Sequence, residues 1–337
     1  MPKNMVNNLK VLFNTAGNSS IGMGHIYTCS KVGDILKQRH CSENLYLIPK
    51  NSIQGIQKLT EFGYKFKTLE SEDFLDSIEY IKEFNPDIVI NDIIYVKEGF
   101  MKNLRQKTKG LIVNMEHIKE PKSMDYADII FNSIYPPPKE TITNYYYGPK
   151  YAPLKDSFKG LPKKKIKKDV NNFLISFGGS DPLGLTVNTL EILNMVPEVK
   201  ADVILGPGFN HHEHLTSSLE RIDKNRFRLV SSVNNLLPYM LSDDIGLVSG
   251  GNTIYELAAT GTPGIALSQS EMEKERTRLF SDYGMVLDGD SNGGLINSIK
   301  KLMGDYELRE KMSKQGQKLV DGKGLDRIVE IIINKLN

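Results

Sequence analysis

A histidine beside two glycines stands where the first apolar run of the chain gives way to a helical pattern. The run at 10–15, "KVLFNT", is followed by Gly22, Gly24 and His25. An imidazole titrates near neutral pH and can take a proton from an incoming nucleophile, and the glycines let the loop pass close under a ligand. We predict that His25 is a catalytic base; the alternative is a histidine that fills a gap at a helix start.

A glycine-rich turn follows a second apolar run, at 171–177, before a helical pattern near 185. It comprises Gly178, Gly179, Ser180 and Asp181. Glycines let backbone N–H groups approach a phosphate, and a helix N-terminus favours negative charge. Ser180 could cap the helix or bond a phosphate oxygen, whereas Asp181 favours the capping role. A purely structural turn is the alternative.

A second turn of this kind follows the apolar run at 245–250. It consists of Ser249, Gly250, Gly251, Asn252 and Thr253. Glu256 lies one turn into the next helix, where a carboxylate can accept both hydroxyls of a ribose while the helix N-terminus holds a diphosphate. An ordinary acidic residue in a first helical turn is the alternative. Two such turns in one half of the chain favour nucleotide binding.

The other histidines are weaker candidates. His117 follows the fifth apolar run and could face the same edge as His25. His211, His212 and His214 form the run "HHEH", but spacings of one and two residues do not place two ligands on one helical face. We interpret this run as an exposed helix start, and we expect no metal site.

Short β-branched runs alternate with helical patterns, which predicts βαβ units and parallel sheets with helices on both faces. The predicted strands are 10–15, 44–49, 64–69, 87–92, 109–114 and 128–133 in the first half, and 171–177, 201–206, 226–230, 245–250 and 264–268 in the second. The fold class is therefore α/β, with two doubly wound, Rossmann-like domains facing each other across a cleft. Ligands bind at the carboxyl ends of the strands in such sheets.

Domain boundaries follow from a change in composition. The segment 136–168 is rich in proline, tyrosine and lysine and shows little periodicity, so we predict a first domain over 1–148 and a linker over 149–168. Its basic run at 163–168 reads as a solvated linker. A second domain follows over 169–337, and its last helix could return to the first domain.

Bulk composition excludes several classes of protein. The 337 residues have a net charge of +2, which argues against a dedicated nucleic-acid binder, and 39% hydrophobic residues suffice for two cores. The two cysteines suggest a reducing compartment. No apolar stretch approaches the roughly 20 residues of a membrane helix. We therefore expect a cytoplasmic protein.

Five segments of the sequence resemble a known family in the same order along nearly the whole chain. They are "GMGHIYTCSKVGDIL", "YYGPKYAPLKDSF", "ISFGGSDPLGLT", "VSGGNTIYELAATGTP" and "DGKGLDRIV". The chain resembles the UDP-sugar hydrolases of nonulosonic-acid synthesis, which remove UDP from a 2,4-diacetamido-2,4,6-trideoxy sugar on the way to pseudaminic acid and have relatives in spore-coat polysaccharide pathways. Its second half is similar to the N-acetylglucosaminyltransferase of peptidoglycan synthesis. Both have the two-domain GT-B architecture.

The resemblance implies roles for individual residues. His25 matches the catalytic base; the turn 178–181 and the turn 249–253 match the phosphate loops; Glu256 matches the ribose-binding glutamate. Val233 falls where the transferase reads uracil through backbone atoms. On the sugar side we expect Gly22, Gly24 and His117 from their positions after strands, together with Asp92 and Tyr95 from the segment that the family shares in part.

The sugar side also departs from the family. An aspartate-histidine-tyrosine triplet is replaced by "NDIIY", which keeps Asp92 and displaces Tyr95 by one position. Paired aspartates give way to "NMEH", and an asparagine-glutamine pair to residues near "SEMEKE". The nucleotide half is therefore the better matched half.

Three hypotheses for function follow. The first is a hydrolase in which His25 activates water to attack C1 of a UDP-sugar with inversion, without a metal or cofactor. The second is a glycosyltransferase that uses the same donor and an acceptor hydroxyl. The third is a catalytically altered nucleotide-sugar-binding protein that would associate with a cytidylyltransferase of the same pathway.

Overall fold

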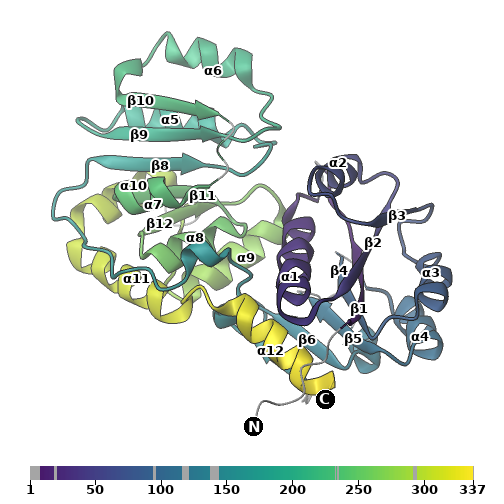
Figure 1. Ribbon diagram of the computed structural model, residues 1–337. Coiled ribbons are helices and arrows are strands. Elements are labelled where there is room, and N and C mark those ends of the chain that lie inside the picture. The colour runs from purple at the N-terminus through teal and green to yellow at the C-terminus, as the bar shows by residue number, and fades with distance from the viewer. Residues whose placement is uncertain are drawn as a thin grey trace. The chain divides into compact units, whose positions relative to one another are not determined.

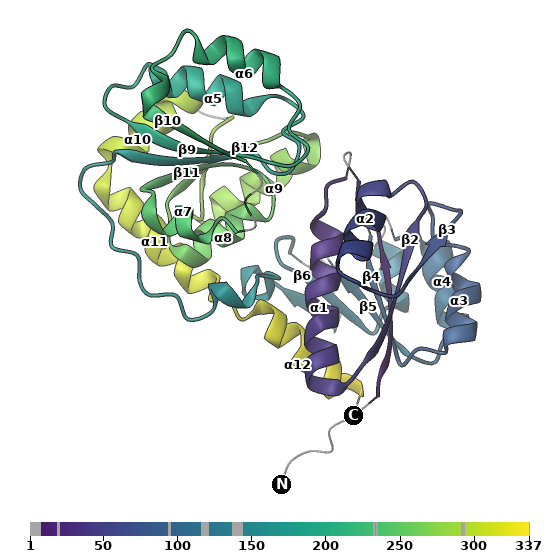
Figure 2. The ribbon, with the colours of Figure 1, turned by 45° about the horizontal axis from the view of Figure 1, so that its top comes forward.

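The computed structural model describes residues 8–18, 21–93, 96–115, 121–136, 144–231, 233, 235–290 and 294–336. These residues form two α/β units. The first contains the chain up to Pro153 and again from Lys323, and the second contains Leu154–Gly322. Each unit has a parallel sheet with helices on both faces, which confirms the predicted fold class (Figures 1 and 2).

The first sheet has seven parallel strands in the order β3-β2-β1-β4-β5-β6-β7. Its strands are β1 (Lys10–Thr15), β2 (Glu43–Pro49), β3 (Phe66–Leu69), β4 (Ile88–Asp92), β5 (Leu111–Met115), β6 (Ile129–Asn132) and β7 (Tyr145–Tyr147). The central strands are continuous apolar runs because helices bury both faces of the sheet. The strand order reverses direction between β1 and β4, so this pair is the topological switch point of the unit.

Helices cover the two faces of the first sheet separately. They are α1 (Gly24–His40), α2 (Ile53–Glu61), α3 (Ser77–Phe84), α4 (Glu98–Lys107) and α12 (Gly324–Leu336), with the 3₁₀ turns η1 (Pro121–Tyr126) and η2 (Pro149–Tyr151). One core joins β1 to α1 and α12, and the other joins the opposite face of β1 to α3 and α4.

The second sheet has six parallel strands in the order β10-β9-β8-β11-β12-β13. They are β8 (Asn172–Ser176), β9 (Lys200–Leu205), β10 (Phe227–Ser231), β11 (Ile245–Ser249), β12 (Gly264–Leu267) and β13 (Leu287–Asp288). The strand order reverses between β8 and β11, which places a second switch point between the two strands that precede the glycine-rich turns.

The helices of the second unit complete the doubly wound fold. They are α5 (Leu185–Asn194), α6 (His212–Leu219), α7 (Leu237–Ser242), α8 (Thr253–Thr260), α9 (Glu271–Asp282), α10 (Leu295–Gly304) and α11 (Tyr306–Leu319), with η3 (Asp156–Phe158) and η4 (Lys224–Arg226). The core on one face of this sheet contains residues of α5, α6, α10 and α11.

The segment 136–168, whose composition led to the predicted linker over 149–168, contains more structure than that composition indicates. Tyr145–Tyr147 forms β7, the edge strand beside β6. The prediction missed this strand because three consecutive tyrosines give no alternation of apolar and polar residues.

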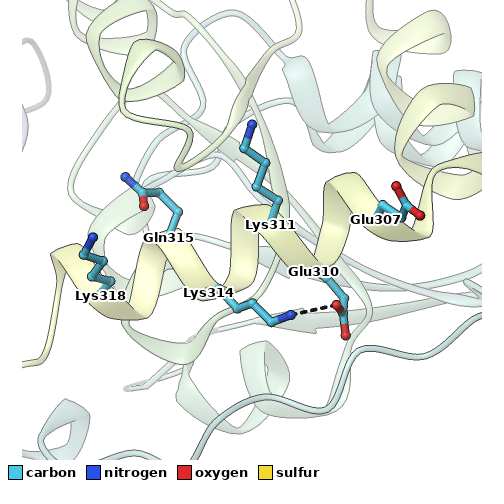
Figure 3. Close-up of a pocket in the computed structure, with 6 residues that line it drawn as sticks. All are labelled: Glu307, Glu310, Lys311, Lys314, Gln315 and Lys318. Carbon is cyan, nitrogen blue, oxygen red and sulfur yellow. Dashed lines mark hydrogen bonds and ion pairs between the residues drawn. The ribbon is translucent and has the colours of Figure 1, made fainter.

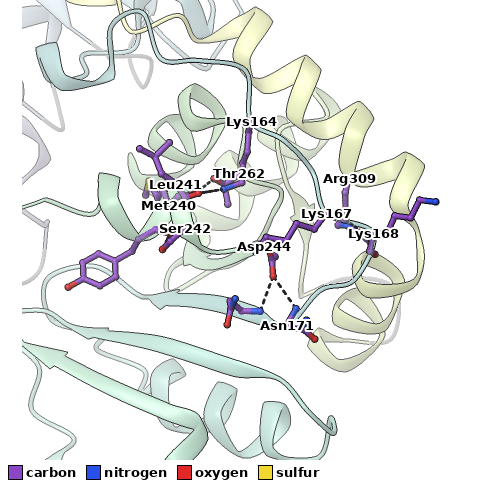
Figure 4. Close-up of polar contacts among 12 residues, drawn as sticks. Lys164, Lys167, Lys168, Asn171, Met240, Leu241, Ser242, Asp244, Thr262 and Arg309 are labelled. Atoms are coloured by element: carbon purple, nitrogen blue, oxygen red, sulfur yellow. Dashed lines mark hydrogen bonds and ion pairs between the residues drawn. The ribbon is translucent and has the colours of Figure 1, made fainter.

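The basic run at 163–168 is not wholly solvated either. Lys164 is partly buried, and its ammonium group donates to the carbonyl oxygens of Met240 (2.7 Å) and Leu241 (3.1 Å) at the end of α7 (Figure 4). The fully buried Arg309 of α11 donates to the carbonyl oxygens of Lys167 and Lys168. Carbonyl groups at a helix end and in an extended segment need donors, and these cations supply them.

The final helix, α12, belongs to the first unit. It buries Leu325, Ile328, Val329 and Ile332, which recur at the spacing of one helical face. Arg39 of α1 forms an ion pair with Asp326 (Nη2–Oδ1 2.5 Å). The chain therefore passes from the first unit to the second after Pro153 and returns at Lys323.

Candidate functional site

His25 and Asp92 meet at the switch point of the first sheet. His25 is the second residue of α1, and Asp92 is the last residue of β4 and pairs in register with Thr15 at the end of β1. His25 Nδ1 lies 2.7 Å from Asp92 Oδ1, within hydrogen-bonding distance. The imidazole is 21% exposed and the carboxylate 3%. A buried carboxylate that accepts from Nδ1–H leaves Nε2 as the basic nitrogen.

Two glycines before α1, Gly17 and Gly22, form backbone hydrogen bonds. Gly22 has a φ of +76° and donates its N–H to the carbonyl oxygen of Asn18, a conformation that glycine adopts without strain. Gly55 of α2 donates its N–H to the carbonyl oxygen of Gly17. A Cβ on Gly17 would lie 2.6 Å from Ile26 Cγ1, so Gly17 packs tightly on the first turn of α1.

Cys29 lies beside the second carboxylate oxygen of Asp92. It follows His25 by one helical turn on α1, and its Sγ lies 4.0 Å from Asp92 Oδ2. Burial, together with the negative charge of Asp92, raises the pKa of the Cys29 thiol well above its usual value. The thiol therefore stays protonated and presents a weak S–H donor to the carboxylate.

A ladder of buried asparagines lies one residue before the strand ends, on the opposite face of the sheet. Asn14 Nδ2 donates to Asn91 Oδ1, and Asn91 Nδ2 donates to Asn114 Oδ1, each at 2.8 Å. All three are essentially inaccessible. They hold β1, β4 and β5 in register beneath the His25–Asp92 pair. Sequence reasoning missed this ladder, although "FNT", "IND" and "VNM" repeat an asparagine at the same place in three strands.

The two glycine-rich turns of the second unit lie next to each other. β8 and β11 are neighbouring strands, and a Cβ on Gly178 would lie 3.7 Å from Ser249 Oγ. Gly178 has a φ of +80°, which restricts this position to glycine in practice. The loop after β9 packs on the same turn, since Gly208 N–H donates to the carbonyl oxygen of Gly179 (2.7 Å). Ser180 lies against this loop, because a Cβ on Gly208 would lie 3.3 Å from Ser180 Cβ.

Asp181 is the side chain that caps α5. Its Oδ1 accepts from Leu185 N–H (2.8 Å) and its Oδ2 from Thr186 N–H (2.9 Å), and the residue is buried. The carboxylate therefore already occupies the N-terminus of α5 where an anion would bind. This geometry supports the capping role of Asp181 over contact with a nucleotide.

A capping pair likewise occupies the N-terminus of α9. Ser270 Oγ accepts from Glu273 N–H (3.2 Å), and Glu273 Oε2 accepts from Gln269 N–H (2.8 Å). Burial is the main cause that raises the pKa of Glu273.

The N-terminus of α8 differs from these two. In the described structure its N-cap residue, Asn252, forms no side-chain capping bond to the helix. Gly250, Gly251 and Thr253 complete the turn, and Glu256 lies partly exposed in the first turn of the helix. Among α5, α8 and α9, the helices that follow the neighbouring strands β8, β11 and β12, only α8 begins without a side-chain cap in the described hydrogen bonds.

The structure describes only some of the remaining candidate residues. Tyr95 and His117 lie outside the described residues, so the structure does not place them. Val233 is described and half-buried, but its neighbours at 232 and 234 are not. α6 begins at His212 with mostly exposed side chains. Across the described ranges, no group of three or more His, Cys, Asp or Glu side chains is arranged to hold a metal ion.

Two shallow hollows lie away from these edges. One, of about 350 Å³, runs along the charged face of α11, where Lys314 pairs with Glu310 at 2.8 Å (Figure 3). The other, of about 230 Å³, lies near the amino ends of β8–β10 and is lined by Asp202, Arg228 and Asp243, among others. Exposed ion pairs of this kind contribute little to binding or stability.

Comparison with known proteins gives relatives for nearly the whole chain. No protein-family model matches the sequence. An uncharacterized protein of Methanocaldococcus jannaschii is 32% identical over 289 residues, which cover 82% of this chain and 58% of that protein. The chain thus spans little more than half the length of this relative. The spore coat polysaccharide biosynthesis protein SpsG of Bacillus subtilis is 29% identical over 330 residues, 94% of this chain and 95% of SpsG.

Several solved structures are similar in fold to this chain. Acinetobacter baumannii MurG has a TM-score of 0.73 at 12% identity and covers 97% of this chain, which covers 99% of MurG. The chain has the GT-B fold. S. aureus MnaA, in a structure with UDP, has a TM-score of 0.66 at 13% identity, with 98% of this chain and 97% of MnaA covered. At these identities the likeness concerns the GT-B fold alone.

No helix within the described ranges combines the length and the apolar composition that a membrane span requires.

Proposed function

We propose that this protein is an enzyme that hydrolyses a UDP-sugar at its anomeric carbon. The observation that carries the proposal is the buried Asp92 carboxylate, 2.7 Å from His25 at the ligand-binding edge of a doubly wound sheet. A histidine that only fills a gap needs no negatively charged partner, and burying a carboxylate costs several kcal/mol. A paired Asp and His at a switch point is the arrangement of an oriented general base.

The proposed reaction forms one bond and breaks one. His25 Nε2 takes a proton from water as the water oxygen attacks C1 of the sugar. The bond between C1 and the β-phosphate oxygen breaks, and UDP leaves with its electron pair. Attack from the face opposite UDP inverts the anomeric centre. Asp92 holds the imidazole tautomer and stabilises the imidazolium that forms.

The second unit would bind the nucleotide. Asp181 and the Ser270–Glu273 pair cap α5 and α9, so the backbone N–H groups of Gly251, Asn252 and Thr253 at the start of α8 are the donors that we assign to the diphosphate, whereas Gly250 N–H donates to the carbonyl oxygen of Leu267 (3.2 Å). Glu256 would accept the ribose hydroxyls, and Gly178 and Gly179 would border the phosphates from the neighbouring turn. The backbone near Val233 is our proposed contact for uracil.

The similarity to SpsG, a polysaccharide biosynthesis protein, supports a role in the synthesis of a surface polysaccharide or nonulosonic acid. The sugar we propose is of the 2,4-diacetamido-2,4,6-trideoxy class, and association with a cytidylyltransferase of the same pathway is part of this proposal. MnaA, which shares the fold, was solved with UDP, and this supports the choice of nucleotide. We place the reaction in the cytoplasm, where the free thiols Cys29 and Cys41 stay reduced.

The test is a panel of UDP-sugars incubated with the pure protein in the absence of any acceptor. Equal amounts of UDP and free sugar support hydrolysis. UDP release that requires an added acceptor hydroxyl identifies a glycosyltransferase, and binding without turnover identifies a nucleotide-sugar-binding protein.

A His25→Ala variant tests the assigned base. It should lower turnover about 10²–10⁴-fold while UDP affinity stays close to that of the wild type. His40→Ala, at the other end of the same helix, is the matched control and should keep full activity. Full turnover in His25→Ala would remove this histidine from the mechanism.

A further inference from the structure

Arg276 of α9 reaches the N-terminus of α8. Its Nη2 lies 3.3 Å from Oδ1 of Asn252, the N-cap residue of α8. Asn252 directly follows the Gly250–Gly251 pair, so the guanidinium group lies beside the turn that we assign to the diphosphate. No sequence motif pointed to this residue, because it lies 24 positions away in another helix.

The start of α9 is held firmly against the same turn. A Cβ on Gly250 would lie 2.5 Å from Thr277 Oγ1 and 3.0 Å from the Glu273 carbonyl oxygen. Gln269 Nε2 also donates to the carbonyl oxygen of Phe177 (3.0 Å), just before the other glycine-rich turn. Arg276 therefore belongs to a helix, α9, that is held against both turns. A side chain on such a rigid helix loses little conformational entropy when it binds a ligand.

A diphosphate bound at the two glycine-rich turns would need a positively charged side chain nearby. The segments 176–186 and 248–256 contain no lysine or arginine, whereas Asp181, Glu256 and Glu273 all lie in or near them. A helix N-terminus contributes about half a positive charge, and a diphosphate bears two or more negative charges. Arg276 already acts on this site electrostatically, since its charge lowers the pKa of Glu273 against the dominant effect of burial.

We propose that Arg276 is the cationic ligand of the diphosphate at the start of α8. The guanidinium exchanges its bond to Asn252 Oδ1 for phosphate oxygens, which its planar fork can bind in pairs. Asn252 holds the group in place in the absence of nucleotide. Since the bond from C1 to the β-phosphate breaks in the proposed reaction, Arg276 also stabilises the negative charge that develops on the departing UDP. This inference rests on the function proposed above.

The test is the affinity for UDP and for uridine, measured by calorimetry and ligand-observed NMR. Arg276→Gln should weaken UDP binding about 10- to 100-fold, because it removes a charge-assisted hydrogen bond, and leave uridine binding unchanged. Arg276→Lys keeps the positive charge but not the planar fork, so its affinity for UDP should lie between those of the wild type and Arg276→Gln. Arg278→Gln, an exposed arginine two positions along α9, is the matched control and should bind UDP like the wild type.

The outcomes separate this inference from the proposed function. Wild-type protein that binds UDP, with Arg276→Gln binding it equally well, overturns the role of Arg276 and leaves the nucleotide site standing. Loss of uridine and UDP binding together in Arg276→Gln shows a structural role and also overturns the inference. Wild-type protein that does not bind UDP overturns both proposals. If Arg276→Gln does not fold, as judged by circular dichroism, Arg276→Lys decides by the same comparison.

Discussion

Replacing Asp92 by asparagine tests the His25–Asp92 pair more sharply than removing the histidine. The substitution keeps size and shape and changes only which atoms donate and accept. Asp92 Oδ1 accepts from His25 Nδ1, and Oδ2 faces the Cys29 thiol, whose raised pKa keeps it protonated and a donor. An asparagine amide would therefore turn its oxygen toward the thiol and its NH₂ toward the imidazole.

This orientation reverses the histidine tautomer. An NH₂ that donates to Nδ1 leaves the ring proton on Nε2, which then cannot accept a proton from water. The loss should equal the contribution of the general base, about 10²–10⁴-fold in kcat, or about 3–5 kcal/mol in the activation free energy. UDP affinity should stay within about twofold of the wild type, because the second unit holds the residues that we assign to UDP.

The assay is steady-state release of UDP, with the thermal midpoint measured beside it. Asp87→Asn is the matched control: this exposed carboxylate, just before the same strand, accepts from Lys10 N–H at 2.8 Å and has no contact with His25 among the described interactions. It should keep full activity. A kcat for Asp92→Asn within threefold of the wild type, in a folded variant, would refute the argument that Asp92 sets the tautomer.

Two further predictions concern the second unit. Gly250→Ala should destabilise the protein by about 1–3 kcal/mol in urea unfolding, because its Cβ would lie 2.5 Å from Thr277 Oγ1, whereas Gly251→Ala should be nearly neutral, with its nearest neighbour at 3.8 Å; equal losses would contradict the packing argument. Burial, with repulsion from Asp202 next, raises the pKa of Asp243 from 3.8 to about 7. Between these two values the folded protein holds a proton that the unfolded chain has released, so the contribution of Asp243 to stability falls as the pH rises from about 4 to 7. Asp243→Asn should therefore be more stable than the wild type at pH 8 by up to about 4 kcal/mol, since about three pKa units correspond to about 1.4 kcal/mol each, and close to it in stability near pH 4; the same difference at both pH values would contradict this assignment.

The sequence determined the elements and their order. Apolar β-branched runs alternating with amphipathic patterns predicted both parallel sheets, because a strand buried on two faces has to be apolar along its whole length. The glycines at 178 and 250 marked strand-to-helix turns, since the backbone there adopts a positive φ or packs too closely for a side chain. These are local requirements, and a local sequence pattern reveals them.

Local patterns failed where a residue's partner lies elsewhere in the chain. The sequence predicted that Asp92 lies on the sugar side of the site. Because Asp92 is at the end of β4, next to β1, it contacts His25, which lies 67 residues earlier in the chain. Asp181, by contrast, caps α5 as the sequence favoured, because its partners Leu185 and Thr186 lie only four and five residues further along the chain. The strand β7 depends on the exposed edge of β6 rather than on its own three tyrosines.

Only the tertiary structure brings the candidate catalytic and binding residues into contact. Parallel strands place all their carboxyl ends at one edge, and the strand order reverses at the paired strands β1 and β4 and at β8 and β11, so residues far apart in sequence converge outside these strand ends. Arg276 shows the same rule, since it reaches Asn252 through the packing of α9 against Gly250. The sequence specified which side chains were available, and the crossovers of the chain decided which of them meet.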